Sequence, residues 1–465
     1  MENINNTIVA EVRSLVHALP QTDAHNRLIQ LSRDVWNDEP ELWAQVIAPY
    51  LEPHLRSLGV EDVRAELDPS TGALYLKVHD PLVGWNSEWL DDALVDETPP
   101  PWLLPVLAMK SAYSLDEATR PRLLALLTSP TLAYLRRLYL ENAELGPELG
   151  HRLASATHLT RLTHLMAPHN AMGDGSVAAL AAAPHLANLR ALDLADNDLS
   201  ATGIEALMAS PHLTQLRVLG LDRNRLASDA VGLLAQSTSL RSVKLLSLNS
   251  ATLQPGDVQA LAASPHLAQL EQLSLESNYH LGDEAAQALA RSPHMARLRR
   301  LCMGSASLTQ TGVRALAQSA NLHHLTHVRL GSNDMQGPAG VQALAQSPHL
   351  ANLVYLDLRG NSVGNHYGDG AAIAIAQSPH LTQLRYLHLE NTQTTDAGLI
   401  ALAKSPNLHH LETLVIGYNT ITDAGARALV ASPYLKRLKR LYIYHNHLTR
   451  TGAKSLEEAF DHVSA

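Results

Sequence analysis

Hydrophobic residues recur along most of the chain in one fixed arrangement, which residues 211–226 show clearly. This segment reads PHLTQLRVLGLDRNRL and fits the pattern LxxLxLxxNxL, in which the asparagine is Asn224. Alternation of apolar and variable residues within LxLxx predicts a short strand. Leu219 and Leu221 are expected to face a core, and the residues between and after them are expected to face outward.

The same pattern fits twelve successive segments at steps of 27 or 28 residues, with one step of 31. Its first apolar position falls at Leu135, Leu162, Leu189, Leu216, Val243, Leu270, Leu298, Leu325, Leu353, Leu384, Leu411 and Leu438. Helices are predicted between the strands, as in residues 202–209, where Ile204, Leu207 and Met208 share one helical face. A single strand and helix cannot bury their apolar faces alone, so the units are expected to stack into an α/β solenoid.

This repeat resembles the leucine-rich repeats, and its length and helical second half are similar to the ribonuclease-inhibitor-like class. The resemblance covers residues 104–460 when residues 104–109 are counted as a degenerate first strand. It implies a horseshoe with a parallel β-sheet on the concave face, helices on the convex face, and a binding surface without catalytic chemistry. In this family the asparagine pairs with backbone groups of the turn. Eight repeats keep it, and the four that depart carry Ala143, Ala251, Ala306 and Thr392.

The interior chemistry changes near residue 103. All five tryptophans, Trp36, Trp43, Trp85, Trp89 and Trp102, precede that point. We therefore expect two domains: a mainly helical N-terminal or capping domain over 1–103, and a solenoid of about twelve repeats with an N-terminal cap strand over 104–465. Within the first, helices are expected over 8–19, 28–36 and 41–58, and residues 63–67 and 73–77 are expected to form a hairpin. A cap over the first repeat and a domain with its own partner both remain possible roles.

Composition and motifs narrow the function. A net charge of −10 disfavours general binding to nucleic acid, and no run of 18 apolar residues predicts a membrane span. The single cysteine, Cys302, and the absence of a secretory signal at the N-terminus favour the cytoplasm. The chain has no GxxxxGK[ST], GxSxG or CxxC motif, and a lone thiol lacks the base that nucleophilic catalysis needs. We expect no cofactor and no enzymatic activity.

A row of histidines follows proline in six repeats, at His185, His212, His266, His294, His349 and His380. The residue before a proline is disfavoured in the α conformation, so each Pro-His step is expected to end a helix and turn the chain toward the next strand. A metal site needs several ligands that converge on one point. Because these histidines are spaced one per repeat, we interpret them as turn residues and expect no metal site.

Recognition residues concentrate in the last five repeats, whereas the middle repeats present mostly serine, asparagine and glycine at outward positions. Tyrosine and arginine dominate binding hot spots, and a strand needs neither. We predict partner binding by His327, Arg329, Tyr355, Asp357, Arg359, Tyr386, His388, Glu390, Tyr418, Arg440, Tyr442, Tyr444 and His445. A smaller cluster, Arg137, Tyr139, Glu141 and His164, lies at the other end of the array.

The interpretation that the sequence favours is a non-enzymatic scaffold that binds a protein on its concave face. Two alternatives remain open. A basic group near Tyr442 and Tyr444 suits nucleic acid or an acidic partner, and its members are Lys436, Arg437, Lys439, Arg440, Arg450 and Lys454. An enzyme or effector activity could instead belong to residues 1–103. The insertion at residues 364–370 is either a functional lip or a tolerated loop.

Overall fold

The computed structural model describes residues 63–67, 74–78, 108–111, 119–128, 135–361 and 368–465, and it divides into two units, residues 1–224 and 225–465. The helices predicted over 8–19, 28–36 and 41–58 lie outside the described residues, as does most of the 364–370 insertion. None of the helices in these ranges has the length and apolar composition needed to cross a membrane.

In the described part of the first unit, the predicted hairpin comes first and the repeats follow. Its strands are β1 (Val63–Leu67), β2 (Leu74–Val78), β3 (Ala108–Ser111), β4 (Arg137–Leu140), β5 (His164–Met166), β6 (Ala191–Asp193) and β7 (Val218–Gly220). Its helices are α5 (Thr119–Leu127), α6 (Gly146–Ser155), α7 (Gly173–Ala181) and α8 (Ala201–Met208), with a 3₁₀ turn η2 (Pro184–Leu186). β1 and β2 pair antiparallel, which confirms the hairpin, and β2 to β7 pair parallel in order.

The second unit is built from the same repeat. Its strands are β8 (Leu245–Ser247), β9 (Gln272–Ser274), β10 (Arg300–Cys302), β11 (His327–Arg329), β12 (Tyr355–Asp357), β13 (Tyr386–His388), β14 (Thr413–Val415), β15 (Arg440–Tyr442) and β16 (His462–Ser464). Its helices are α9 (Ser228–Gln236), α10 (Pro255–Ala263), α11 (Gly282–Arg291), α12 (Gln310–Ala317), α13 (Ala339–Ala345), α14 (Gly368–Ala376), α15 (Asp396–Ala403), α16 (Asp423–Val430) and α17 (Arg450–Glu457). Its 3₁₀ turns are η3 (Thr238–Ser242), η4 (Pro265–Leu267), η5 (Pro293–Met295), η6 (Ala320–Leu322), η7 (Pro348–Leu350) and η8 (Pro406–Leu408).

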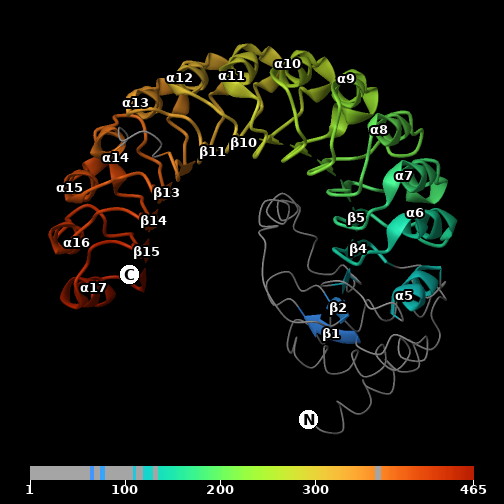
Figure 1. Cartoon of the computed structure of the whole chain (residues 1–465), viewed down its shortest axis with the longest axis horizontal. Coiled ribbons are helices and arrows are strands. Elements are labelled where there is room, and N and C mark those ends of the chain that lie inside the picture. Colours follow the sequence, from blue (N-terminus) through green and yellow to red (C-terminus); the bar gives the residue numbers. More distant parts are fainter. Residues whose placement is uncertain (1–62, 68–73, 79–107, 112–118, 129–134, 362–367) are drawn as a thin grey trace, which may run out of the picture. The chain divides into compact units, whose positions relative to one another are not determined.

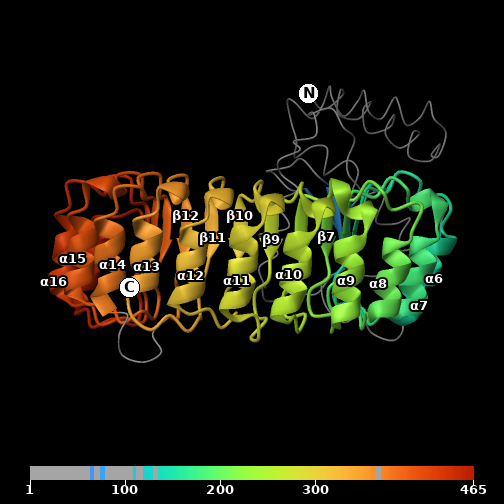
Figure 2. The same cartoon turned by 90° about the horizontal axis from the view of Figure 1, so that it is seen from above.

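The described repeats of each unit stack as an α/β solenoid, as predicted. Within the second unit, the helices lie side by side in one layer and the strands form another layer on the inner side of its curve (Figures 1 and 2). Parallel pairing aligns equivalent residues of neighbouring strands. Leu387 of β13 therefore pairs with Leu356 of β12 on one side and with Leu414 of β14 on the other. These leucines are fully buried between the layers. β3 begins at Ala108, later than the cap strand that the sequence predicted, and residues 104–107 lie outside the described part.

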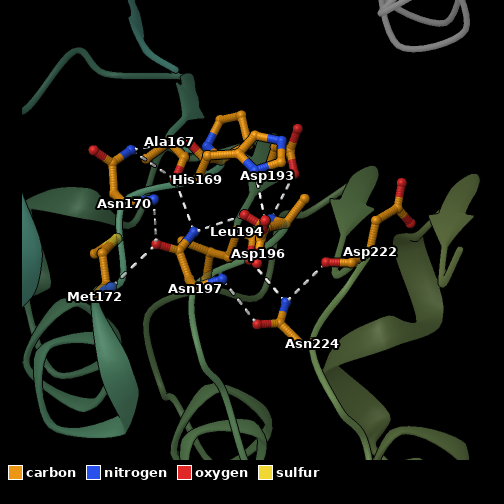
Figure 3. Close-up of polar contacts among 12 residues, drawn as sticks. Ala167, His169, Asn170, Met172, Asp193, Leu194, Asp196, Asn197, Asp222 and Asn224 are labelled. Atoms are coloured by element: carbon orange, nitrogen blue, oxygen red, sulfur yellow. Dashed lines mark hydrogen bonds and ion pairs between the residues drawn. The ribbon is translucent and has the colours of Figure 1, made fainter. Parts of the chain in front are cut away.

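The repeat asparagine ties each turn to the one before it. Oδ1 of Asn224 accepts hydrogen bonds from the backbone N–H groups of Asn197 and Leu199, at 3.1 and 3.0 Å. Its Nδ2 donates to the carbonyls of Leu194 and Leu221, at 2.9 and 3.1 Å. Asn197 makes the same kind of bonds one repeat earlier (Figure 3). The predicted role of the asparagine is confirmed, because one buried side chain pairs backbone groups of two successive turns.

The residue before this position has a left-handed backbone in all twelve repeats. The twelve residues are Asn142, His169, Asp196, Arg223, Ser250, Ser277, Ser305, Ser332, Gly360, Asn391, Tyr418 and His445. This conformation costs a residue other than glycine roughly 1 kcal/mol or more. The asparagine bonds offset that cost, because they form only when the chain turns sharply at this point.

Repeats without the asparagine are still held by the next repeat. The N–H groups of Ala251 and Ala306 donate to Oδ1 of Asn278 and Asn333, both at 3.0 Å. Thr392 replaces part of the missing amide, since its hydroxyl donates to a carbonyl of its own turn at 2.8 Å. The departures from the pattern therefore interrupt the asparagine row without opening the turns.

Buried serines that follow the helices, five of them directly before a Pro-His step, form a second row of bonds that the sequence did not predict. Oγ of Ser210 donates to the carbonyl of Ala181 at 2.5 Å and accepts from the N–H of His212 at 3.2 Å. The same bond to an alanine carbonyl of the preceding repeat is made by Ser264, Ser292, Ser319, Ser347, Ser378, Ser405 and Ser432. These serines fix the turn between each helix and the next strand.

A third row joins the first turns of neighbouring helices. Oδ1 of Asp396 accepts from the N–H groups of Thr422 and Gly425, at 2.8 and 2.9 Å, and Oδ2 accepts from the Thr422 hydroxyl at 2.6 Å. Asp369 and Asp423 make equivalent bonds to Thr395 and Thr449. A Cβ atom on Gly425 would lie 2.6 Å from Asp396 Oδ1, so the bond requires glycine at this position.

Alanine at Gly425 should therefore destabilise the protein, although alanine is normally the better helix former. We expect Gly425→Ala to lower the free energy of unfolding by about 2 kcal/mol, because the added methyl forces the Asp396 carboxylate away. Gly232 of α9 has nothing within 4 Å of such a Cβ, so Gly232→Ala should raise stability by up to about 1 kcal/mol. Urea denaturation followed by circular dichroism compares the two. Equal effects of both substitutions would contradict this role for Asp396.

Candidate functional site: the outward face of β11–β15

The outward positions of β11, β12 and β13 carry rings that touch in sequence. Parallel register aligns His327, Tyr355 and Tyr386 across the three strands. The Tyr355 and Tyr386 rings stack with centroids 4.2 Å apart and planes 6° apart, and His327 stacks on Tyr355 at 5.6 Å. The Arg329 guanidinium carbon lies 5.4 Å from the centre of the Tyr355 ring. We call His327, Arg329, Tyr355 and Tyr386 the tyrosine surface.

Partial burial changes the chemistry of these phenols. Burial raises the pKa of Tyr386 well above its ordinary value, and the neighbouring Tyr355 raises it further. Burial also raises the pKa of Tyr355, although the positive charge of Arg329 opposes the shift. Both hydroxyls therefore stay protonated at any physiological pH and can act as hydrogen-bond donors and acceptors.

A polar chain lies beside the tyrosine surface and crosses four repeats. His388 has one ring nitrogen, Nε2, 3.0 Å from a Glu390 carboxylate oxygen and the other, Nδ1, 3.6 Å from Asp357 Oδ1. The Tyr444 hydroxyl donates to the same Glu390 oxygen at 2.9 Å, and burial together with this bond raises the pKa of Tyr444 to about 12. Arg359 Nε lies 3.7 Å from Asp357 Oδ2. These contacts hold five of the predicted site residues in fixed positions.

Burial divides the predicted site residues into two groups. Asp357 and His388 occupy outward strand positions, yet their side chains are only 2% and 8% exposed. They position Glu390 and Arg359 and offer little surface of their own. Tyr355, Tyr386, Tyr444 and Glu390 are partly exposed, and Tyr418, Tyr442, Arg440 and His445 are exposed.

Tyr418, Tyr444 and His445 form a second ring cluster where the last two repeats turn. The Tyr418 and His445 rings stack at 4.4 Å, and Tyr444 meets each of them edge-on. Tyr444 reaches across β14 because Gly417 leaves room: a Cβ there would lie 2.6 Å from the Tyr444 ring. Arg440 and Tyr442 extend from β15 and join neither ring cluster.

Cys302 lies on the same side of the sheet but is buried. Its outward position on β10 is covered, and burial raises the pKa of its thiol well above the ordinary value. A thiol held in its protonated form is a poor nucleophile. In the part of the chain that the structure describes, no three His, Cys, Asp or Glu side chains gather in a way that would hold a metal ion.

The first unit has its own titratable groups on the outward face. Burial, with help from Arg137 and Arg190, lowers the pKa of His164 to about 3, so this imidazole stays neutral. Burial raises the pKa of Asp193 to about 7, although the Ala195 N–H donates to its carboxylate at 3.0 Å. The carboxylate lies over Gly220, where a Cβ would be 2.6 Å from Oδ1 (Asp193 is labelled in Figure 3). Tyr139 and Glu141 of the predicted smaller cluster lie on β4 and just after it.

Comparison with known proteins identifies the class. The sequence profile described as Leucine Rich repeat matches residues 185–208, 321–345 and 407–430. A chain in the crystal structure of the yeast Rad7 and Elc1 complex is similar, with a TM-score of 0.50 and 14% identity over 96% of this chain and 98% of that chain. An internalin, InlF of Listeria monocytogenes, has a TM-score of 0.42 and 20% identity over 67% of this chain and 82% of that one. No curated protein sequence matches.

The chain is a leucine-rich repeat protein. Three of its own repeats match the family profile, and its strand–turn–helix units carry the asparagine bonds that the resemblance implied. The profile match supports the family, and the structural likeness to the chain in the yeast complex supports the fold.

The raised pKa of Asp193 predicts a stability that falls as pH rises. The folded protein holds a proton on this carboxyl up to about pH 7, whereas the unfolded chain loses it near pH 4, so folding becomes less favourable across that interval. Asp193→Asn keeps the acceptor for Ala195 and removes the titration. We expect this variant to gain more stability over the wild type at pH 8 than at pH 5, as measured by thermal melts. A gain of the same size at both pH values would contradict the assignment.

Proposed function

We propose that this chain is a non-enzymatic scaffold that binds a protein partner on the outward face of β11–β15. The observation that carries the proposal is the continuous contact of His327, Tyr355 and Tyr386. Equivalent positions on β9 are Gln272 and Ser274, so the same backbone accepts polar side chains without rings. The fold therefore does not require the tyrosines, and a binding role accounts for them.

Pre-organisation supports the same proposal. Stacking fixes the tyrosine rings, and the Asp357–His388–Glu390–Tyr444 chain fixes the residues next to them. A partner that binds here loses little side-chain entropy on this side of the interface, which leaves more of the contact free energy for affinity. The backbone beneath is equally constrained by the asparagine and serine rows.

Other features fit a scaffold of the ribonuclease-inhibitor-like class in a reducing compartment such as the cytoplasm. The repeat alternates a three-residue strand with a helix of seven to ten residues, as in β11 and α13 or β9 and α11. The one cysteine is buried and cannot form an internal disulfide. The yeast chain of similar fold was solved as part of a complex of two proteins, Rad7 and Elc1, which accords with a role in protein binding.

The proposal predicts that Tyr355→Ala/Tyr386→Ala removes a specific partner. Purified wild type and variant are immobilised and used to capture proteins from native lysate, and the captured protein is then produced and its affinity measured. Two hot-spot tyrosines should together account for about 2 kcal/mol or more, which lowers affinity at least about thirtyfold. Thermal melts establish that the variant still folds.

Tyr279→Ala is the matched control, because Tyr279 is 64% exposed and lies outside β11–β15 in the same unit. It should leave capture unchanged. A partner that binds the double variant as tightly as the wild type would move the binding site off this face and refute the proposal.

A further inference from the structure

Exposed large hydrophobic side chains concentrate at the end of the second unit. Within the described ranges there are five: Tyr279, Tyr418, Val430, Tyr434 and Tyr442. Four of the five lie between residues 418 and 442. Single exposed hydrophobic residues are ordinary on a protein surface, but a local group of them marks an interaction site.

The same segment is strongly basic. Residues 424–456 contain seven lysines and arginines and no aspartate or glutamate. Lys436, Lys439 and Arg440 are exposed, and none of them takes part in an ion pair among the described residues. By contrast, Arg385, which occupies the position of Lys439 two strands earlier, lies 3.6 Å from Glu412 on the strand between them. The last repeat therefore presents positive charge that its own neighbours leave uncompensated.

These charges and rings lie along one stretch of backbone. Leu435, Leu438 and Leu441 are buried at 4%, 5% and 0% exposure, and this anchors the residues between them on the outside. Tyr434, Lys436, Lys439, Arg440 and Tyr442 form the outer side, and we call these five residues the terminal surface. The acidic residue beside it is Glu412, whose carbonyl accepts the N–H groups of Lys439 and Arg440 and whose carboxylate lies 3.6 Å from Arg385. Further along the chain, Glu458 lies 3.6 Å from Lys454.

The strand next to this surface is β16, and one of its edges pairs with no described strand. β16 pairs with β15 in parallel, with Arg440 opposite His462, and it is the last strand of the sheet in the described structure. An extended polypeptide can pair with the backbone of such an edge while its side chains contact the neighbouring surface. A nucleic acid has no backbone that forms this pairing.

We propose that the terminal surface binds an acidic, partly apolar segment of a protein partner. The inference rests on the proposed function and adds the chemistry of the partner. Acidic side chains pair with Lys436, Lys439 and Arg440, and apolar ones cover Tyr434 and Tyr442. The overall charge of −10 disfavours nucleic acid, which is bound through broad fields of positive charge.

The test uses the full-length protein and a short fluorescein-labelled peptide in which glutamate alternates with valine and leucine. Fluorescence anisotropy measures its affinity for wild type and for Lys436→Glu/Lys439→Glu/Arg440→Glu. We expect the triple substitution to weaken binding at least about tenfold, and added salt to weaken binding to the wild type. Tyr434→Ala/Tyr442→Ala should weaken it several-fold without changing the net charge.

A matched control has the same change in charge elsewhere in the unit. Arg291→Glu/Arg297→Glu/Arg314→Glu reverses three exposed arginines outside the terminal surface and should leave peptide affinity unchanged. Absence of peptide binding by the wild type, or equal weakening by both triple variants, overturns the proposal. Tighter binding of single-stranded oligothymidylate, lost in the first triple variant, would overturn it in favour of nucleic acid.

The peptide measurement and the capture experiment fail independently. Tyr355→Ala/Tyr386→Ala leaves the terminal surface intact and should retain peptide binding. Suppose that this variant loses capture and that the wild type does not bind the peptide. The tyrosine surface would then remain the partner site, and only the acidic-segment proposal would be wrong. Peptide binding with capture unaffected by the tyrosine substitutions would remove the tyrosine surface instead.

Discussion

The structure depends on a buried amide side chain that bonds to the backbone of two successive repeats. A turn with a left-handed residue leaves N–H and C=O groups that no strand or helix can pair, and burial makes such groups costly. Asn224 and its equivalents pair them, at distances near 3 Å. No repeat can do this alone, because the Oδ1 bonds go to the preceding turn. Stacking is therefore required by hydrogen bonding as well as by apolar burial.

The rigid turns determine what the outward face can be. Each strand is only three or four residues long from β4 to β15, so it places about two side chains in line with those of its neighbours. Parallel register brings equivalent positions together, and tyrosines at successive equivalents, Tyr355 and Tyr386, consequently stack. The left-handed residues add a second row, in which Tyr418 meets His445. The residues of the binding face are thus the equivalent positions of successive repeats, aligned by the parallel register.

Much of this arrangement follows from the sequence, because a residue that recurs once per repeat at a fixed spacing occupies the same structural position in every repeat. The twelve frames, the strand and helix of each unit, and the role of the asparagine were predictable. The serine and aspartate rows were not, because serine before proline and aspartate at a helix start are also ordinary local capping residues. Only the structure shows that Ser210 and Asp396 bond to a different repeat.

Exposure was the least predictable property of the site. Alternation places Asp357, His388 and Cys302 on the outward face, yet all three side chains are buried there. The alternation of the sequence predicts which face a side chain is on, but it does not predict how far the surrounding side chains bury it. β16 was also missed, since His462–Ser464 lacks the leucines that mark the other strands.

Amide hydrogen exchange of the free protein tests the central claim most directly. The N–H groups of Leu199, Leu253, Leu308 and Ile421 lie in turns but donate to asparagine Oδ1 atoms at 2.9 to 3.1 Å. If the asparagine row holds the repeats together, these amides exchange as slowly as strand amides such as that of Leu387. Exchange at the rate of exposed turn amides would show that the turns open freely, and the account of a pre-formed binding face would then be wrong.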